Sequence, residues 1–343
     1  MNTFGTIFRV SIFGESHGEE IGVVIDGVEP GVALSEQDFA ADIARRRSGA
    51  KGTTPRIEAD EPHILSGVFE GHTTGAPLTI VFKNTNTRSQ DYSRLKDVPR
   101  PGHADFTANV KYGGFQDPRG GGHFSGRLTL PVVAAGVVAK KILAETIDEE
   151  TNGHVRFRCK ARLTEVGGVT EAKDWENALE QAQKEGDSLG GVVECVVDGL
   201  PAGLGEPFWD SVESKLAHAL FAIPGVRGVE FGDGFTAARM KGSEHNDCFT
   251  PDGIDGNEGL VTPVTNHAGG VNGGITNGNP LVFRVAFKPT SSIAKAQRTF
   301  DFEKGEMTTL QVPGRHDTCF ALRTPVIVEA MAAIVLADLI DLA

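Results

Sequence analysis

The sequence predicts an α/β protein of the α+β type, folded as a single large pseudo-symmetric sandwich over residues 1–343. Two observations favour one unit over two domains. The segment VIDGVEPG (24–31) is echoed by VVDGLPAG (196–203), and no Pro/Ser-rich linker divides the chain. The echo indicates an internal duplication, in which about 22–47 is repeated by about 191–221. Chance similarity between two Asp-Gly turns is the alternative.

The N-terminal segment begins with strand-like patterns. TIFRVSIFG (6–14) alternates, and GVVIDGVEPG (22–31) indicates a strand followed by Asp-Gly and Pro-Gly turns. A helix is expected from about 35 to 47, with Ser35 as its N-cap and Asp38 completing a capping box.

Three further helices are expected. They cover about 129–145 (TLPVVAAGVVAKKILAE), 209–221 and 324–342. The last is apolar enough to lie in a core or an interface.

Charge argues against generic nucleic-acid binding, because the net charge is −13 and that function needs a basic surface. Residues 45–127 nevertheless hold 13 Lys/Arg and 8 Asp/Glu. A basic segment in an acidic protein favours a small anionic ligand, and ordinary surface ion pairing explains it equally well.

The chain is expected to be cytoplasmic. Its four cysteines are widely spread and form neither a disulfide framework nor a zinc pattern. The N-terminus has no apolar signal core, and no apolar run reaches membrane-spanning length. No metal site is expected, because no His/Asp/Glu group has metal-ligand spacing.

Gly-rich polar clusters carry the residues suited to chemistry. They are GESHG (14–18), RPGHADF (100–106), YGGFQDPRGGGHFSGR (112–127), NHAGGVNGGITNGNP (266–280) and GRHD (314–317). Glycine-rich backbone can present N–H groups to phosphate, and arginine forks bind phosphate or carboxylate. His17 and His103 stand in Gly-flanked loops and could transfer protons. Lys288, followed by hydroxyl residues, suits a phosphorylated cofactor.

Each signal has a plainer explanation when taken alone. A loop histidine is usually only solvated, the arginines at 45–47 could complement a helix dipole, and Asp317 could simply pair with Arg315. GGVNGG is no dinucleotide fingerprint, because a strand and not a helix follows it. GESHG has the outline of a hydrolase elbow, but its preceding strand is N-terminal, which argues against that fold.

Taken together and in order, the motifs resemble the chorismate synthase family. FRVSIFGESHG, ARRRSG, TTPRIEAD, RPGHADF, RGGG, VRGVEFGDGF, GSEHND, NHAGGVNGGITNG, KPTSSI and GRHD extend the match from about residue 3 to 338. The resemblance implies a family-specific β-α-β sandwich and a homotetramer. It also implies conversion of 5-enolpyruvylshikimate 3-phosphate to chorismate by 1,4-anti elimination, with reduced FMN required and no net redox change.

The resemblance also implies roles for individual residues. His17 matches the histidine that protonates the departing phosphate, His103 the one beside the reduced flavin, and Asp317 the aspartate that helps accept a proton through the flavin. The implied substrate-binding residues are Ser16, Arg45, Arg46, Arg47, Arg100, Arg119, Arg127 and Arg315. The implied cofactor-binding residues are Arg46 and Lys51 for NADPH, and His123, Ser125, Gly273, Lys288, Pro289, Thr290, Ser291, Ser292 and Arg315 for FMN.

The chain departs from the family pattern in two segments that contact the flavin in other members. The usual RGGGRSSAR is RGGGHFSGR here, with His123, Phe124 and Gly126 substituted, so an arginine and a serine that usually meet the flavin are missing. His123 replaces the arginine and Ser125 remains, and Pro224-Gly225 stands where Asn-Ala or Gln-Ala is common. No extra reductase domain is recognisable, so an external flavin reductase is expected, with NADPH as an indirect reductant. The alternatives are a non-catalytic binder of phosphorylated metabolites and an assembly protein that uses its C-terminal helix.

Overall fold

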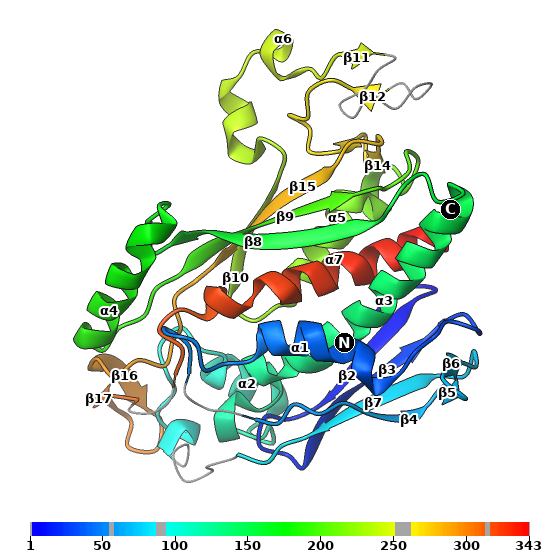
Figure 1. Cartoon of the computed structure of the whole chain (residues 1–343). Coiled ribbons are helices and arrows are strands. Elements are labelled where there is room, and N and C mark those ends of the chain that lie inside the picture. The colour runs from blue at the N-terminus through cyan, green and yellow to red at the C-terminus, as the bar shows by residue number, and fades with distance from the viewer. Residues whose placement is uncertain (1, 55–57, 87–93, 251–261, 313–315, 343) are drawn as a thin grey trace.

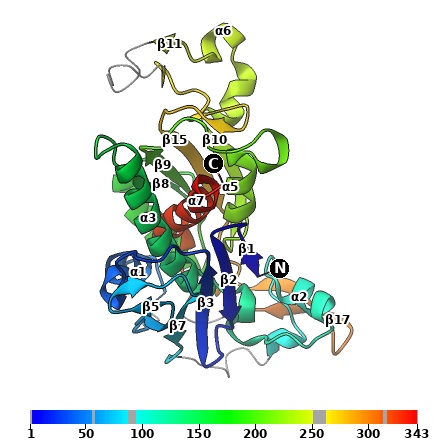
Figure 2. The same ribbon diagram turned by 90° about the vertical axis from the view of Figure 1, so that its right-hand side faces the viewer.

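Two antiparallel sheets enclose a layer of helices in the structure, a computed structural model that describes residues 2–54, 58–86, 94–250, 262–312 and 316–342. Figure 1 shows the layers: the sheet containing β8, β9 and β15, then α7, α3 and α1, then the sheet containing β2, β3 and β7. Figure 2 shows the same order from the side. The predicted sandwich class is confirmed.

The first sheet is N-terminal and has the strand order β1-β2-β3-β7-β4. Its strands are β1 (Thr3–Phe4), β2 (Arg9–Gly14), β3 (Glu20–Asp26), β4 (His63–Ser66) and β7 (Leu78–Lys83). Its buried face pairs Ile21 with Phe82, Val23 with Ile80 and Ile25 with Leu78. These apolar rows form the floor on which α3 packs.

The second sheet has the order β10-β15-β9-β8. Its strands are β8 (Arg158–Val166), β9 (Gly191–Asp198), β10 (Val226–Phe231) and β15 (Leu281–Phe287). Strict alternation along β9 and β15 buries every second side chain beneath α7, including Cys195 opposite Phe283.

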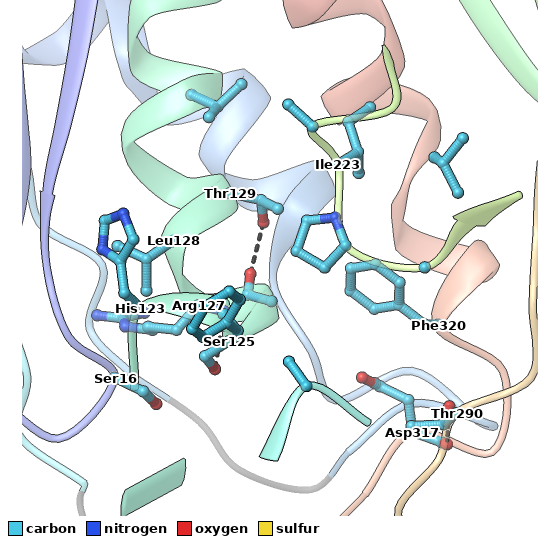
Figure 3. A pocket seen from close by; sticks show the side chains of 18 of the residues that line it. Ser16, His123, Ser125, Arg127, Leu128, Thr129, Ile223, Thr290, Asp317 and Phe320 are labelled. Atoms are coloured by element: carbon cyan, nitrogen blue, oxygen red, sulfur yellow. Dashed lines mark hydrogen bonds between the residues drawn. The ribbon is translucent and has the colours of Figure 1, made fainter. Parts of the chain in front are cut away.

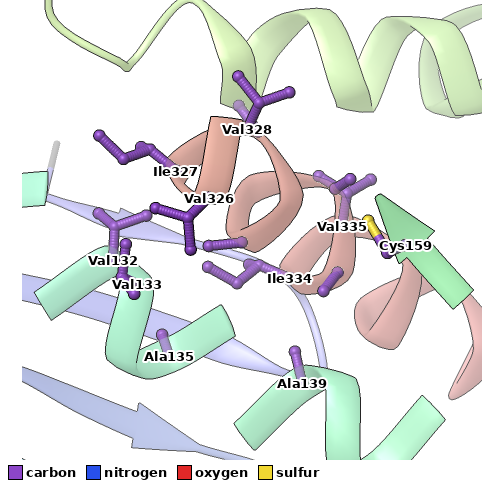
Figure 4. Close-up of a cluster of buried hydrophobic side chains, with 14 of the residues drawn as sticks. Val132, Val133, Ala135, Ala139, Cys159, Val326, Ile327, Val328, Ile334 and Val335 are labelled. Atoms are coloured by element: carbon purple, nitrogen blue, oxygen red, sulfur yellow. The ribbon is translucent and has the colours of Figure 1, made fainter. Parts of the chain in front are cut away.

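The helix layer consists of α1 (Ala40–Arg46), α3 (Thr129–Glu150), α5 (Val212–Leu220) and α7 (Pro325–Ile340). Helices α3 and α7 pack closely against each other. Figure 4 shows their apolar side chains facing one another, with Cys159 of β8 beside Val335 of α7. Gly136 stands at the closest approach, where an added Cβ would overlap Ala330. None of the described helices is both long and apolar enough to cross a membrane.

The remaining elements lie at the periphery. The peripheral helices are α2 (Asp105–Tyr112), α4 (Trp175–Glu185) and α6 (Gly242–His245). In the described part of the chain, the peripheral strands form four two-stranded ribbons: β5–β6 (Val68–Phe69, His72–Thr73), β11–β12 (Phe249–Thr250, Thr262–Pro263), β13–β14 (Val271–Asn272, Ile275–Thr276) and β16–β17 (Gln297–Asp301, Glu306–Leu310). Short 3-10 turns cover Glu36–Phe39, Arg119–Phe124, Gly126–Leu128, Ala172–Asp174, Phe208–Asp210, Gly234–Arg239 and Phe320–Arg323.

The helix start predicted at 129 is confirmed, the one at 324 is correct to within a residue, and those at 35 and 209 differ in position. Ser35 forms the expected capping box, with its backbone N–H donating to Asp38 at 2.7 Å, but a 3-10 turn precedes α1. The helix expected from 209 begins at Val212, because the Ser211 hydroxyl accepts from the Ser214 N–H at 3.1 Å and caps it there. Helices α2 and α4 were not predicted.

The two echoed segments have similar local structures. Each is a strand paired antiparallel with the strand before it, β3 with β2 and β9 with β8, although α4 separates β8 from β9 along the chain. Gly27 and Gly199 follow with φ of 84° and 82°, and an added Cβ at either would overlap a backbone carbonyl. These turns need glycine in both halves. Their common origin stays a prediction.

Replacing Gly136 by Val should destabilise the fold by about 1–3 kcal/mol, because the new side chain overpacks the α3–α7 contact. Denaturant unfolding measures this. Ala144→Val on an exposed part of α3 is the matched control and should cost less than about 1 kcal/mol. Equal losses in the two variants would contradict a tight helix contact at Gly136.

Candidate active site

A cavity of about 930 Å³ lies between the two halves of the molecule. Figure 3 shows Ser16, His123, Ser125 and Arg127 on one side, and Thr290, Asp317 and Phe320 on the other. The start of α3, the loop after α5 and the 288–292 segment complete the lining. The polar and charged lining thus comes from segments far apart in the sequence.

The cavity is electropositive. Its lining includes seven Arg or Lys residues and three Asp or Glu residues. Burial, followed by the nearby Arg323 and Arg127, lowers the pKa of Arg46 to about 9. The N-terminus of α3 adds its partial positive charge. The cavity is therefore suited to a ligand that carries several negative charges.

Arg46 and Arg127 are held from opposite sides by Asp60. Arg46 donates from Nε to Thr129 Oγ1 at 3.0 Å and contacts Asp60 Oδ2 at 3.4 Å, while Arg127 pairs with the other carboxylate oxygen. Asn84 accepts from Arg127 Nε at 2.9 Å. Both guanidinium groups are buried and pre-oriented, which reduces the entropy that a ligand would lose in binding them.

Ser16 and His17 form one corner, directly after β2. Ser16 Oγ lies 3.3 Å from His17 Nδ1, and the Ser16 N–H donates to the Gly122 carbonyl at 3.1 Å. Ser16 lines the cavity, whereas His17 lies behind it, beneath Gly120. Nearby, His123 Nδ1 donates to the Gly14 carbonyl at 2.8 Å, which holds the glycine loop to the end of β2.

The glycine loop separates the two predicted histidines. Gly120, Gly121 and Gly122 all have positive φ, between 54° and 83°. A Cβ on Gly120 would overlap the His17 ring, and one on Gly121 would lie 3.4 Å from the His103 ring. Two imidazoles approach the same short segment only because that segment has no side chains.

His103 is held at the opposite side of the loop by a buried ion pair. Its Nδ1 lies 2.7 Å from Asp105, which also receives both Nε and Nη2 of Arg100 at 2.7 Å. Burial lowers the pKa of His103, and Arg100 and Lys288 act in the same direction against the hydrogen bond to Asp105. His103 is therefore neutral at pH 7.

Asp317 is fixed at the far wall. Its carboxylate accepts from the Thr54 N–H at 2.9 Å and from Arg323 Nη2 at 2.8 Å. Arg323 was not predicted, although it lines the cavity. The sequence does hold a signal for Arg323, because it stands just before the N-terminus of α7. A positive charge at that end opposes the helix dipole, which indicates that Arg323 has a role other than stabilising the helix.

The KPTSSI segment links His103 to Asp317. Lys288 Nζ donates to Ser291 Oγ at 2.7 Å, and Ser291 Oγ donates to the Gly102 carbonyl. Ser292 accepts from Arg100 Nη1 at 2.9 Å, and Thr290 Oγ1 donates to the Asp317 carbonyl at 2.9 Å. Burial, then Arg227, lowers the pKa of Lys288.

Most of the predicted residues meet at this cavity. The lining includes Ser16, Arg46, Arg47, Arg100, His103, His123, Ser125, Arg127, Lys288, Pro289, Thr290, Ser291, Ser292 and Asp317, with His17 behind. Arg315 lies outside the described residues.

Four predicted residues lie outside the lining of this cavity, and their expected ligand contacts stay predictions. Arg45 donates two hydrogen bonds to the buried Glu329, at 2.7 and 2.6 Å. Lys51 pairs on the surface with glutamates of α4, and Arg119 with Asp117 at 2.7 Å. Gly273 is exposed at the β13–β14 turn.

Replacing Gly120 by Ala should displace the His17 ring, in addition to the roughly 1–2 kcal/mol expected of a left-handed alanine. Gly121→Ala is the matched control, with similar backbone strain and only an ordinary contact to His103. Unfolding measurements and histidine side-chain NMR should therefore show a larger loss of stability, and a shifted His17 signal, for Gly120→Ala. The same stability and spectra in both variants would contradict the proximity of Gly120 to His17.

Comparison with known proteins agrees with this arrangement. The sequence matches the chorismate synthase family over residues 8–340. It is 60% identical over 338 residues to a chorismate synthase of Chitinophaga pinensis, covering 98% of this chain and 96% of that protein. It is 45% identical over 363 residues to a chorismate synthase of Dehalococcoides mccartyi strain BAV1, again covering 98% and 96%.

A solved structure agrees as well. A crystal structure of chorismate synthase superposes with a TM-score of 0.72 at 26% identity, covering 98% of this chain and 92% of the other. With the ordered motifs and the shared fold, these similarities lead to one conclusion: the chain belongs to the chorismate synthase family, lyases of the shikimate pathway (EC 4.2.3.5).

Proposed function

We propose that this chain converts 5-enolpyruvylshikimate 3-phosphate to chorismate and phosphate by 1,4-anti elimination, with reduced FMN required. One observation carries the proposal: two histidines approach the same glycine loop beside a cation-lined cavity. Elimination breaks a C–O bond to phosphate and a C–H bond, so it needs a proton donor and a proton acceptor in one anion-binding site.

The cavity cations bind the substrate in this proposal. The substrate carries two carboxylates and one phosphate. Arg46 and Arg127 offer buried guanidinium groups that are already oriented, and the partly buried Arg323 adds a third. Protonated His17, relayed by the Ser16 hydroxyl at 3.3 Å, donates a proton to the departing phosphate. A protonated phosphate is the better leaving group, which favours an acid that titrates near neutral pH.

The proton acceptor is assigned to the opposite wall. Asp317 is an acceptor whose two oxygens are already oriented by Thr54 and Arg323. His103, neutral at pH 7, offers a second basic nitrogen on the same side. The separation of donor and acceptor across one cavity suits an anti elimination, in which the two groups leave from opposite faces.

The residues present fit FMN as the cofactor. A volume of about 930 Å³ is at the upper end for small-molecule sites, which leaves room for a flavin beside the substrate. Apolar residues such as Ile223 and Met331 suit a flavin ring, and Lys288 with its neighbouring hydroxyls suits the phosphate. When bound, reduced flavin supplies electron density that eases loss of the phosphate, while the protein supplies placement and protons.

Flavin reduction is assigned to an external reductase, with NADPH as the indirect reductant. Lys51, one of the two residues that match NADPH positions, is exposed and paired with α4, away from the cavity. We also propose a cytoplasmic location, which the four unpaired cysteines support.

Anaerobic mixing of the protein with 5-enolpyruvylshikimate 3-phosphate and chemically reduced FMN should release chorismate and phosphate in equal amounts. Oxidised FMN should release neither. His17→Ala should lower kcat by about 10²–10⁴-fold with little change in substrate affinity, because it removes only the proton donor. His154→Ala, at a histidine in the turn that follows α3, is the matched control.

Tight substrate binding by the wild type without products would contradict the lyase proposal and favour a non-catalytic binder. Unchanged turnover in His17→Ala would contradict the role of that residue.

The exposed face of the second sheet supports the proposed homotetramer. One row crosses all four strands with alternating charge: Arg162 pairs with Glu194 at 2.7 Å, and Arg284 pairs with Glu230 at 2.8 Å. Glu194 is also the register partner of Arg284. Such a row is self-complementary, because a two-fold axis through its centre sets each charge against an opposite one.

Glu194→Lys should weaken self-association, because it places three positive charges side by side in this row. Analytical ultracentrifugation should show a fall in oligomer mass. Glu185→Lys makes the same charge change on the exposed face of α4 and should leave the mass unchanged. If Glu194→Lys remained a tetramer, this face of the sheet would not be part of the interface.

A further inference from the structure

We propose that Asp105 is a positioning residue that keeps the proton of His103 on Nδ1 and thereby leaves Nε2 as the nitrogen that accepts a proton in the cavity. The kinetic part of this inference rests on the proposed function. The tautomer itself does not, since it follows from the contacts of the protein alone.

The carboxylate of Asp105 is saturated and immobile. It is the first residue of α2, and its side chain is only 8% exposed. Arg100 donates to it from the backbone N–H at 3.0 Å and from Nε and Nη2 at 2.7 Å each. Burial alone would raise the pKa of Asp105, but the hydrogen bonds from Arg100 and His103 hold it well below its usual range. It is an anion throughout the physiological range.

Two contacts compete for Nδ1 of His103. Asp105 Oδ1 lies 2.7 Å away, and Arg100 Nη2 lies 3.0 Å away. One ring nitrogen cannot donate to the carboxylate and accept from the guanidinium at once. The carboxylate contact is shorter, an ionised carboxylate can only accept, and Arg100 Nη2 already donates to Asp105 at 2.7 Å. The proton therefore lies on Nδ1.

The tautomer of His103 determines which of its ring nitrogens can accept a proton in the cavity. With Nδ1 protonated, the lone pair on Nε2 is the only basic position of the ring, and this nitrogen lies on the side of Gly121. Arg100 and Lys288 are the cations that act on the ring and oppose its protonation, and Asp105 is the anion that favours it. Asp105 thus sets both the tautomer of the imidazole and the stability of the imidazolium formed at Nε2.

Long-range ¹⁵N–¹H NMR of the wild-type protein tests the tautomer without any variant. We expect Nδ1 of His103 to be protonated and Nε2 to be unprotonated at pH 8. Protonated Nε2 with Nδ1 accepting from Arg100 would overturn the proposal, whatever the enzyme's activity.

Asp105→Asn should then weaken this preference and populate the Nε2-protonated tautomer, because the amide NH₂ and Arg100 can both donate to Nδ1. It should also lower the pKa of His103 further, since the favourable anion is lost. The matched control is Asp233→Asn, which alters an aspartate–histidine pair with the same 2.7 Å contact, to His267 outside the cavity. It should shift the signals of His267 and leave those of His103 unchanged.

The kinetic readout separates positioning from a general loss of structure. With reduced FMN, Asp105→Asn should lower kcat by about 10²–10⁴-fold at nearly constant KM, and the acidic limb of kcat should move to lower pH. Asp233→Asn should retain wild-type turnover. A changed tautomer with unchanged kcat would overturn the kinetic role, whereas an inactive wild type would contradict only the proposed function.

Discussion

Glu329 is the buried charge on which the arrangement of the helices depends. It lies on α7 and is inaccessible to solvent, yet it accepts two hydrogen bonds from Arg45, one from Lys140 at 3.0 Å and one from the Ala161 N–H at 2.8 Å. Burial would raise its pKa, but Arg45 and then Lys140 lower it. One carboxylate therefore ties α1, α3 and β8 to α7. Loss of Arg45 would leave this buried carboxylate with Lys140 as its one remaining cation among the described residues, and breaking a buried ion pair in this way costs up to about 3–5 kcal/mol.

The contacts of Glu329 also explain the position of Arg46. Arg45 and Arg46 are neighbours on α1, so their side chains leave the helix about 100° apart. With Arg45 held by Glu329, Arg46 is directed to Thr129 and Asp60 at the cavity. At the other end of α7, the buried Asp338 accepts from the Thr6 and Ile7 N–H groups at 2.7 Å each. Both sheets are thus fastened to one helix, and the cavity lies between them.

The pair of arginines also marks the limit of prediction from sequence. Helix α1, its capping box and the apolar α3 and α7 follow from local patterns, because capping and burial leave a periodic trace along the chain. The ordered motifs indicated the family and most of the cavity lining. Nothing local distinguishes Arg45 from Arg46, since the distinction depends on Glu329, 284 residues further along the chain. Arg323 was missed for a similar reason, as its partner Asp317 was assigned to Arg315.

The same reasoning bears on the substituted RGGGHFSGR run. Its glycines must stay, because Gly120 and Gly121 allow the two imidazoles to approach one segment and Gly122 follows with the same sign of φ. His123 lines the cavity and also holds the loop, since its Nδ1 donates to the Gly14 carbonyl. A position whose side chain mainly fastens the loop to β2 can change from arginine to histidine while the loop keeps its shape. At position 123 the departure from the family pattern therefore keeps a side chain that can hold the glycine loop against β2.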